Sequence, residues 1–247
     1  MRLISILQSI FIFSLLTSIV TAKEVDVDDL LYMTENYKPY NYVENNQLKG
    51  ISVDLLKLMW KDMGYSEQKI NVFPWSRGYK FLQTKTNSVL FGTARTEERE
   101  NLFKWVCPIT SNKYVLISKK ESKIKINTLD DARKYIIGSI RDDIAEQFLL
   151  NYNFNKIKSV NNIIQNLKKL NAGRIDLIAY GESSMFNTMN ENGYNIKDYE
   201  TVYTLKESQV CYAFHKDTSE KIIQKFQNAI DNIVKQPIYN KLNKKYF

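Results

Sequence analysis

The sequence predicts an α/β protein, and two kinds of segment carry that prediction. Short apolar runs that are typical of buried strands, such as Val89–Phe91 and Ile175–Tyr180, alternate with segments such as Ser219–Lys235, in which apolar residues recur every three or four positions. This alternation is the pattern of strand–helix–strand units. The chain of 247 residues, 44% of them apolar, is long enough to bury one large core or two smaller ones.

In the first half of the chain, local signals predict strands that alternate with helices. Ser52 can cap a helix over Val53–Met63, and a second helix is expected after the segment Pro74–Tyr79. Thr96 can cap a short helix that begins with two glutamates, which suit the positive end of a helix. Strands are expected at Leu30–Met33, Lys69–Phe73, Val89–Phe91, Phe103–Val106 and Tyr114–Ser118.

The second half of the chain continues the same alternation. Its clearest element is the amphipathic helix Ser219–Lys235, whose apolar residues fall on one face. Further helices are expected at Leu129–Lys134, Asp143–Leu150 and Asn162–Leu170. Strands are expected at Tyr135–Ser139, Ile175–Tyr180 and Gln209–His215.

The first 22 residues predict a secretory signal peptide. Arg2 precedes the apolar run Leu3–Val20, which leads into the sequence VTA and then, from Lys23, into charged sequence. We expect cleavage after Ala22 and export to the periplasm, with an uncleaved membrane anchor as the alternative. No lipid anchor is expected because no cysteine lies near the cut, and no later segment is apolar and long enough to span a bilayer.

Charge and composition argue against several classes of function. The formal net charge of +8 comes from scattered lysines, so it favours acidic ligands or surfaces only weakly, and no nucleic-acid-binding motif accompanies it. The lone His215 and two cysteines offer neither the spacing of a metal site nor a nucleophile triad. A glycine-rich phosphate loop is also missing from the sequence. We therefore expect neither a metal nor another cofactor.

The stretch Leu90–Thr110 is the most informative part of the chain. An apolar strand breaks at Gly92 into a corner with small hydroxyl residues, and Arg99 follows one turn into the short helix capped by Thr96. Backbone N–H groups, hydroxyls and a guanidinium would then meet at one place, which suits a small anion such as a carboxylate. The alternative is a surface helix that carries one solvated arginine.

The two cysteines lie about one hundred residues apart, and two cysteines in an oxidising compartment usually pair. A disulfide across such a loop would stabilise the protein by ~4–5 kcal/mol on the loop-entropy estimate. The alternative is two buried thiols that act as small apolar side chains.

Motifs from one end of the chain to the other resemble a known family. In order they are YMTENYKPYNY, LKGISVDLLKLM, FGTARTEERENLFKW, YIIGSIRDD, AGRIDLIAY, CYAFHKDTSEKIIQKFQNAIDNI and IYNKLNKKYF. Their order and spacing, from about Leu31 to Tyr246, resemble the periplasmic family-3 solute-binding proteins of amino-acid uptake systems. The segment FPWSRGY is similar to a less-studied branch of that family.

The resemblance implies a two-lobed periplasmic binding protein fold of type II, with a ligand cleft between the lobes and two hinge strands. Lobe 1 would comprise residues 23–106 plus 212–247, and residues 107–211 would form the hinge strands and lobe 2. Cys107 and Cys211 would then lie on neighbouring hinge strands, where the resemblance implies that they form a disulfide. The protein would act as a monomer.

The resemblance also implies which lobe-1 residues contact a ligand. In the family, the arginine at the position of Arg99 grips a ligand carboxylate with two parallel hydrogen bonds, a geometry that suits a guanidinium. Gly92, Thr93 and Ala94 would line the same place, although Ala94 stands where the family often has a hydroxyl residue.

Several larger side chains could complete the wall of the cleft. An aromatic ring near the position of Tyr40 usually covers the ligand in the family, and Tyr32 and Trp75 are further candidates. Each of the three could equally be a core residue. Arg77 could be a second anion contact or an ordinary surface cation.

Lobe 2 departs from the family pattern. Where the family usually has a Gly-Thr pair, this chain has Arg141, Asp142 and Asp143. The acidic residue that usually takes the ligand's amino group would fall at Gly181, so Glu182 or Asp142 would have to replace it, unless each is simply a helix cap. Recognition of a carboxylate is therefore expected, whereas recognition of an amino group is not.

Three functions compete at this point. The first is a periplasmic protein that captures a small carboxylate-bearing solute, an amino acid or a related acid, by lobe closure and delivers it to the membrane subunits of an ABC importer. The second is a dehydratase-like enzyme on the same scaffold, with Glu182 and Asp142 as acid or base. The third is a ligand-sensing module that docks on a membrane receptor.

Overall fold

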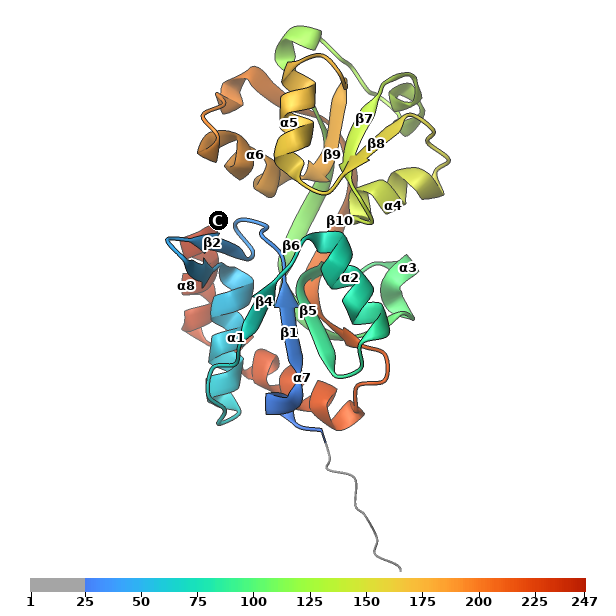
Figure 1. Ribbon diagram of the computed structural model, residues 1–247. Coiled ribbons are helices and arrows are strands. Elements are labelled where there is room, and N and C mark those ends of the chain that lie inside the picture. The colour runs from blue at the N-terminus through green and yellow to red at the C-terminus, as the bar shows by residue number, and fades with distance from the viewer. Residues whose placement is uncertain (1–24) are drawn as a thin grey trace, which may run out of the picture.

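Two α/β lobes joined by two long strands make up the computed structural model, which describes residues 25–247 (Figure 1). The long strands are β6 (Phe103–Lys119) and β10 (Tyr199–His215), which pair antiparallel. They carry one eight-stranded sheet from lobe to lobe, in the order β4-β1-β5-β10-β6-β9-β7-β8. The expected signal peptide, residues 1–22, lies outside the described residues.

Lobe 1 holds one end of this sheet. Strand β1 pairs in parallel with β4 and β5, and β5 pairs antiparallel with β10. A separate hairpin is formed by β2 and β3. The elements of lobe 1 are β1 (Leu31–Thr34), β2 (Tyr42–Glu44), β3 (Gln47–Lys49), α1 (Ile51–Asp62), β4 (Ile70–Val72), α2 (Trp75–Thr84), β5 (Ser88–Ala94), α3 (Glu97–Glu100), α7 (Glu220–Val234) and α8 (Pro237–Tyr246).

Lobe 2 holds the other end of the sheet. Strand β7 pairs in parallel with β8 and β9, and β9 pairs antiparallel with β6. The short helix expected at Leu129–Lys134 is present as a 3₁₀ helix. The other elements of lobe 2 are β7 (Ile137–Ile140), α4 (Ile144–Asn151), β8 (Ile157–Val160), α5 (Ile163–Asn171), β9 (Leu177–Gly181) and α6 (Glu182–Glu191).

The start of α1 corrects the expected cap at Ser52. The helix begins at Ile51, directly after Gly50, whose φ of 124° lies in the region that favours glycine. A Cβ on Gly50 would lie 2.2 Å from the Tyr40 carbonyl oxygen, so no other residue fits there. Ser52 is instead buried inside the first turn, where its carbonyl accepts a hydrogen bond from the Tyr212 hydroxyl at 2.7 Å.

The other caps lie close to the expected positions. Thr96 is the N-cap of α3, and Ser219 is the N-cap of α7, with its hydroxyl accepting from the Ile222 N–H at 3.4 Å. Asn162, expected as the first residue of a helix, instead caps α5 by accepting from the Ile164 N–H at 2.9 Å. Strand β8 and helices α6 and α8 were not among the predicted elements.

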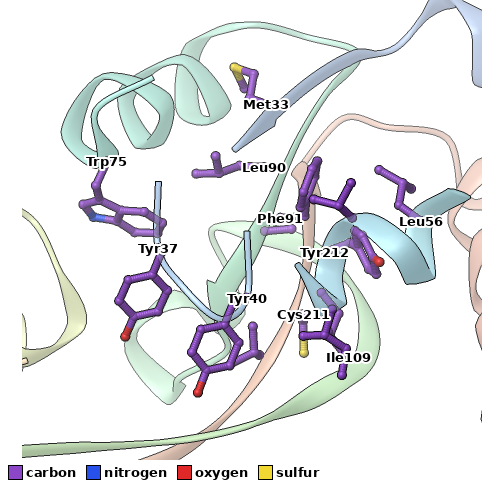
Figure 2. Close-up of a cluster of buried hydrophobic side chains, with 14 of the residues drawn as sticks. Met33, Tyr37, Tyr40, Leu56, Trp75, Leu90, Phe91, Ile109, Cys211 and Tyr212 are labelled. Atoms are coloured by element: carbon purple, nitrogen blue, oxygen red, sulfur yellow. The ribbon is translucent and has the colours of Figure 1, made fainter. Parts of the chain in front are cut away.

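An apolar cluster fills lobe 1 and continues across the cleft into lobe 2, where it includes Ile178 and Met185. Leu56 of α1, Phe91 of β5 and Tyr212 of β10 lie in its centre and are almost fully buried. Figure 2 shows the rings of Trp75 and Tyr37 along one side of the same cluster. Because these rings belong to the core, the surface that lobe 1 presents to the cleft is held rigidly.

A disulfide fastens the two connecting strands together. Cys107 of β6 and Cys211 of β10 are joined, with their Cα atoms 4.8 Å apart. The bridge lies where the pairing of β10 with β6 shifts register, next to Val210. Gln227 of α7 holds the same place, since its side chain accepts from the Cys107 N–H at 3.1 Å and donates to the Cys107 carbonyl at 2.7 Å. The predicted Cys107–Cys211 pair is confirmed, whereas the lobe boundaries after residues 106 and 211 stay predictions.

Candidate functional site

A pocket of about 530 Å³ lies between the lobes. Strand ends from both lobes contribute to it: Glu35 follows β1, Trp75 follows β4, Ile140 ends β7 and Tyr180 lies near the end of β9. The carboxyl ends of strands are the usual place for ligands in open α/β sheets. The volume suits a small organic molecule.

Arg99 lies beside this pocket but is not exposed to it. Only 1% of its surface is accessible, and it is absent from the pocket lining. Its guanidinium donates to the Ala94 carbonyl at 3.3 Å, to the Asp142 carbonyl at 3.2 Å and to the Gln147 side chain at 3.1 Å. Two of these three acceptors belong to lobe 2. Arg99 therefore ties the lobes together, and within residues 25–247 it forms no ion pair.

The Asp142 carbonyl is the centre of this contact between the lobes. Besides the Arg99 bond it accepts from the Trp75 indole N–H at 2.8 Å and from the Gln147 amide at 3.1 Å. Asp142 adopts a φ of 60°, which residues other than glycine adopt only rarely, within the stretch 141–143 that stands where the family usually has a Gly-Thr pair. Its N–H donates to the buried Glu146 carboxylate at 2.6 Å, so Glu146 anchors the backbone at Asp142.

Asp143 brings a carboxylate to the same place. It is the N-cap of α4, and its Oδ2 atom is buried without a hydrogen bond from residues 25–247. Burial raises the pKa of the Asp143 carboxyl to about 6, while the charge of Arg99 and the N–H groups of Ile144 and Ala145 oppose that rise. Arg99 thus faces a carbonyl and a carboxylate that the chain itself supplies.

Glu35 is an acidic residue that the sequence reasoning missed. It lines the pocket, is partly exposed there, and its carboxylate forms no hydrogen bond or ion pair with the described residues. Burial raises the pKa of Glu35 well above its ordinary value, the negative charge of Asp143 raises it further, and Arg99 opposes the rise. Asn41 holds the backbone at this point by donating to the Glu35 carbonyl at 2.8 Å.

Tyr37 explains why the chain has Gly181 where the family has an acidic residue. A Cβ on Gly181 would lie 1.9 Å from the Tyr37 hydroxyl and 2.7 Å from the Asn112 amide nitrogen. The Asn112 amide donates to that hydroxyl at 2.7 Å, and the Tyr37 ring meets Tyr180 edge-to-face at 5.3 Å. Tyr40 stacks behind Tyr37 at 5.1 Å and does not line the pocket. Tyr37 is therefore the ring that packs against Tyr180 and Gly181 of lobe 2.

The lobe-2 candidates lie outside the pocket lining. Glu182 is in the first turn of α6, where it accepts a hydrogen bond from the Thr201 hydroxyl at 2.6 Å. The side chains of Arg141 and Asp142 are exposed and do not line the pocket either. Of this segment, only the Asp142 backbone and the Asp143 carboxylate point toward Arg99.

Gly92, Thr93 and Ala94 at the end of β5 are buried and contact other groups of the protein itself. Gly92 has a φ of 76°, and a Cβ there would lie 2.1 Å from the Asn41 side-chain oxygen. The Thr93 hydroxyl donates to the Leu90 carbonyl at 3.0 Å, and Ala94 contributes its carbonyl to Arg99. None of these residues lines the pocket.

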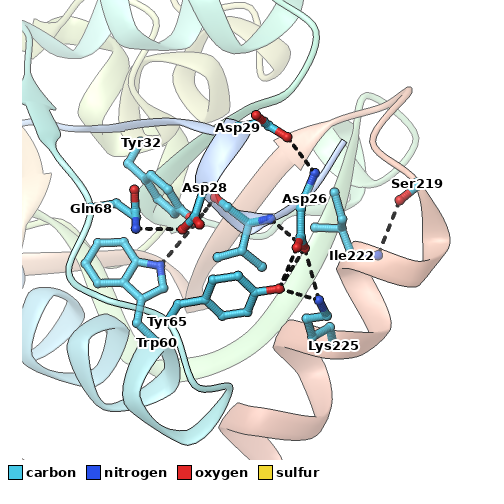
Figure 3. Close-up of polar contacts among 11 residues, drawn as sticks. Asp26, Asp28, Asp29, Tyr32, Trp60, Tyr65, Gln68, Ser219, Ile222 and Lys225 are labelled. Carbon is cyan, nitrogen blue, oxygen red and sulfur yellow. Dashed lines mark hydrogen bonds and ion pairs between the residues drawn. The ribbon is translucent and has the colours of Figure 1, made fainter. Parts of the chain in front are cut away.

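Of the remaining three candidates, one lies in the pocket wall, one on the protein surface and one in the core of lobe 1. Trp75 is 4% exposed and lines the pocket. Arg77 is exposed and lies over the rings of Phe73 and Phe81, as a surface cation would. Tyr32 lies in the lobe-1 core, where its hydroxyl donates to the Val27 carbonyl at 2.9 Å and accepts from the Trp60 indole at 3.1 Å (Figure 3).

Two negative findings apply to residues 25–247. They contain no group of three or more metal-ligating side chains close enough to hold an ion. Within that range no helix has the length and apolar character needed to cross a membrane.

Two α/β lobes with a pocket between them and two connecting strands define the periplasmic-binding-protein class of fold, as predicted. The family model for the bacterial extracellular solute-binding proteins, family 3, matches residues 31–247 of the sequence. The chain therefore belongs to that family.

The relatives are distant in sequence and close in structure. The arginine-binding extracellular protein ArtP of Bacillus subtilis (strain 168) is 25% identical over 223 residues, which cover 86% of this chain and 83% of ArtP. A histidine kinase sensor domain with similarity to periplasmic binding proteins superposes with a TM-score of 0.79 at 18% identity, covering 88% of this chain and 96% of that one. An ancestral arginine-binding protein bound to arginine gives 0.75 at 21% identity, with coverages of 88% and 98%. At these identities the solved structures establish a shared fold.

Proposed function

We propose that the protein captures a small organic solute between its lobes and closes around it. The observation that carries this proposal is a pocket whose lining comes from both lobes, with Glu35 on one side and Tyr180 on the other. Only the closed arrangement offers a ligand all of these contacts. A ligand therefore favours closure through its higher affinity for the closed state.

Delivery to an ABC importer in the periplasm is the second part of the proposal. Membership of the solute-binding family supports it, and so does the likeness to ArtP, which is named as an arginine-binding extracellular protein. A monomer that closes on its solute would present the importer with a surface that differs between the loaded and empty states.

Arg99 can serve as a carboxylate site only under one condition. The guanidinium is buried, and the Asp142 carbonyl occupies the side that faces lobe 2. A ligand carboxylate would have to displace that carbonyl and lie beside the Asp143 carboxylate. The predicted acid ligand therefore needs a rearrangement of the loop at 141–143.

A thermal-shift screen tests capture directly. A panel of amino acids, amines, organic acids, sugars and short peptides is expected to contain at least one solute that raises the melting temperature by mass action. Tyr180→Ala should reduce that shift because the ring lines the pocket. Tyr152→Ala serves as the control and should not reduce it, because Tyr152 is half exposed at the end of α4 in lobe 2 and lies outside the pocket lining. If both variants respond like the unmodified protein, the solute binds elsewhere and the proposed site is wrong.

A sensing role is the second candidate function, and the likeness to a histidine kinase sensor domain favours it. The two roles differ in what the loaded protein does at a membrane. ATP-driven uptake of the solute into vesicles that carry the importer supports delivery, and stimulated kinase phosphorylation without uptake supports sensing.

An enzymatic role has weaker support. Glu182 and Asp142, the predicted acid–base pair, have side chains outside the pocket lining, and Glu182 is bonded to Thr201. The solutes that shift the melting temperature should therefore be recovered unchanged after incubation. Mass spectrometry of the mixture checks this, and a converted product would restore the dehydratase-like hypothesis.

A further inference from the structure

We infer that the solute is a cationic amine whose charge rests on Glu35, and that it needs no carboxylate because the chain fills the carboxylate site with its own Asp142 carbonyl. This inference rests on the proposed function and names the class of solute for the same pocket.

Arg99 is the cation that a ligand carboxylate would need. Three hydrogen bonds to protein acceptors engage its guanidinium, and the rings of Trp75 and Tyr79 lie 5.2 and 5.0 Å from it. The Asp142 carbonyl faces it, and the bond from the Asp142 N–H to Glu146 anchors the backbone of the same residue. The three bonds use three of the five N–H groups of Arg99, and the side chain is only 1% exposed and outside the pocket lining, so the other two are not presented to the pocket.

Two carboxyl groups of the protein already lie near Arg99. Asp143 and Glu35 are both close enough to it for their carboxyl groups to feel its charge, and to feel each other. A ligand carboxylate at this place would be the third one beside a single guanidinium. Like charges in a partly desolvated site oppose such an arrangement.

The pocket itself is lined by more acidic than basic side chains. Lys38 is the cation among the lining residues, and it is already paired with Glu191 at 2.6 Å and with Glu44 at 3.5 Å. Glu35 has no such partner within residues 25–247. An incoming ammonium or guanidinium group would supply that partner and a charge-assisted hydrogen bond.

The pocket also offers apolar surface for the carbon chain of a solute. Phe73, Trp75 and Tyr180 line the pocket together with Ile140. These side chains can cover the carbon chain of an amine, and aromatic faces attract cations. The pocket thus combines one unpaired acid with an aromatic wall.

Isothermal calorimetry with matched pairs tests the inference. The pairs are arginine with agmatine, lysine with cadaverine and histidine with histamine, where each amine lacks only the carboxylate; glutamate serves as the anionic control. We expect at least one amine to bind as tightly as its amino acid or more tightly, and glutamate not to bind. If an amino acid binds at least tenfold more tightly than its matched amine, the inference is overturned and the proposed function still stands. If no solute of the wider panel binds, the proposed function fails as well.

A charge-removing variant locates the contact. Glu35→Gln keeps the shape of the side chain and should weaken binding of the best amine about 30-fold or more, because it removes one member of a partly buried charge pair. Glu182→Gln removes a carboxylate that lies outside the pocket, so it should leave the affinity unchanged. Equal affinities of the Glu35→Gln variant and the unmodified protein would overturn the assignment. Circular dichroism of both variants verifies that they fold.

Discussion

Arg99 and Glu35, two ionisable side chains at the cleft, are held differently. Arg99 is buried and bonded to three protein acceptors, two of them across the cleft. Glu35 is partly exposed in the pocket and has no hydrogen bond or ion pair among the described residues. A side chain that the protein bonds itself serves closure, whereas an acid that is left without a partner is available to a ligand. The predictions below test this division.

Removing the disulfide between β6 and β10 should give the largest effect on stability. Its two cysteines are 104 residues apart, so removing it in a double Cys107→Ala, Cys211→Ala variant should lower the free energy of unfolding by about 4 kcal/mol. Chemical denaturation measures this. The affinity for the solute should change far less, because neither cysteine lines the pocket. A large loss of affinity in a folded variant would show that the hinge and pocket are not separate in function.

Arg99→Met should disfavour the closed state by roughly 3 kcal/mol, because it removes two hydrogen bonds across the cleft and leaves Asp143 without its cation. Small-angle scattering should report a more extended molecule. Binding of an amine and of its amino acid should weaken by the same factor. A loss confined to the carboxylate-bearing partner would mean that Arg99 holds the ligand and not the opposite lobe.

Gly181→Ala should destabilise the closed cleft by about 2 kcal/mol, since the new methyl group would collide with the Tyr37 hydroxyl. Tyr37→Phe removes that hydroxyl and should recover part of the loss. A double-mutant cycle of the two changes measures the coupling. Additive effects would show that Tyr37 does not occupy the space beside Gly181.

Asp143→Asn should give the smallest effect and a dependence on pH. The pKa of Asp143 is raised from 3.8 to about 6, so the folded protein holds this proton more tightly than the unfolded chain. Stability from the protonated form is present below pH 4 and is lost as the pH rises through 6. The charged or titratable groups that face it are Glu35, Tyr37, Arg99, Tyr114, Glu146 and Tyr180.

Asp143→Asn keeps a side chain that can cap α4. Because asparagine does not ionise, the variant does not lose stability as the pH rises through 6. It should therefore be more stable than the unmodified protein by on the order of 1 kcal/mol at pH 7.5, and indistinguishable from it at pH 4. Thermal unfolding at the two pH values provides the measurement. A stability gain that is the same at both pH values would contradict the ionisation of Asp143 as its cause.

Elements with strong local signals could be predicted from the sequence. The amphipathic pattern of Ser219–Lys235 and the apolar run of Ile175–Tyr180 correspond to α7 and β9 within a few residues. Helices α6 and α8 were not predicted because polar residues, largely Asn, Ser, Thr and Lys, hide their apolar spacing. The disulfide followed from the resemblance, because sequence separation alone cannot show that two cysteines meet.

The site was harder to predict than the fold. The residue that faces Arg99 acts through its backbone carbonyl, and no residue type signals such a role. Tyr37 was not singled out because its contact with Gly181 joins positions that lie far apart in the sequence. Glu35 could have been found, since it is the first residue after β1, at the carboxyl end of a parallel strand.

The crystal structure of the protein with the tightest-binding solute of the panel tests the central claim most directly. The account predicts a cationic nitrogen of the solute within hydrogen-bonding distance of the Glu35 carboxylate, and the Asp142 carbonyl still bonded to Arg99. A solute carboxylate bonded to Arg99, with the Asp142 carbonyl displaced, would contradict it.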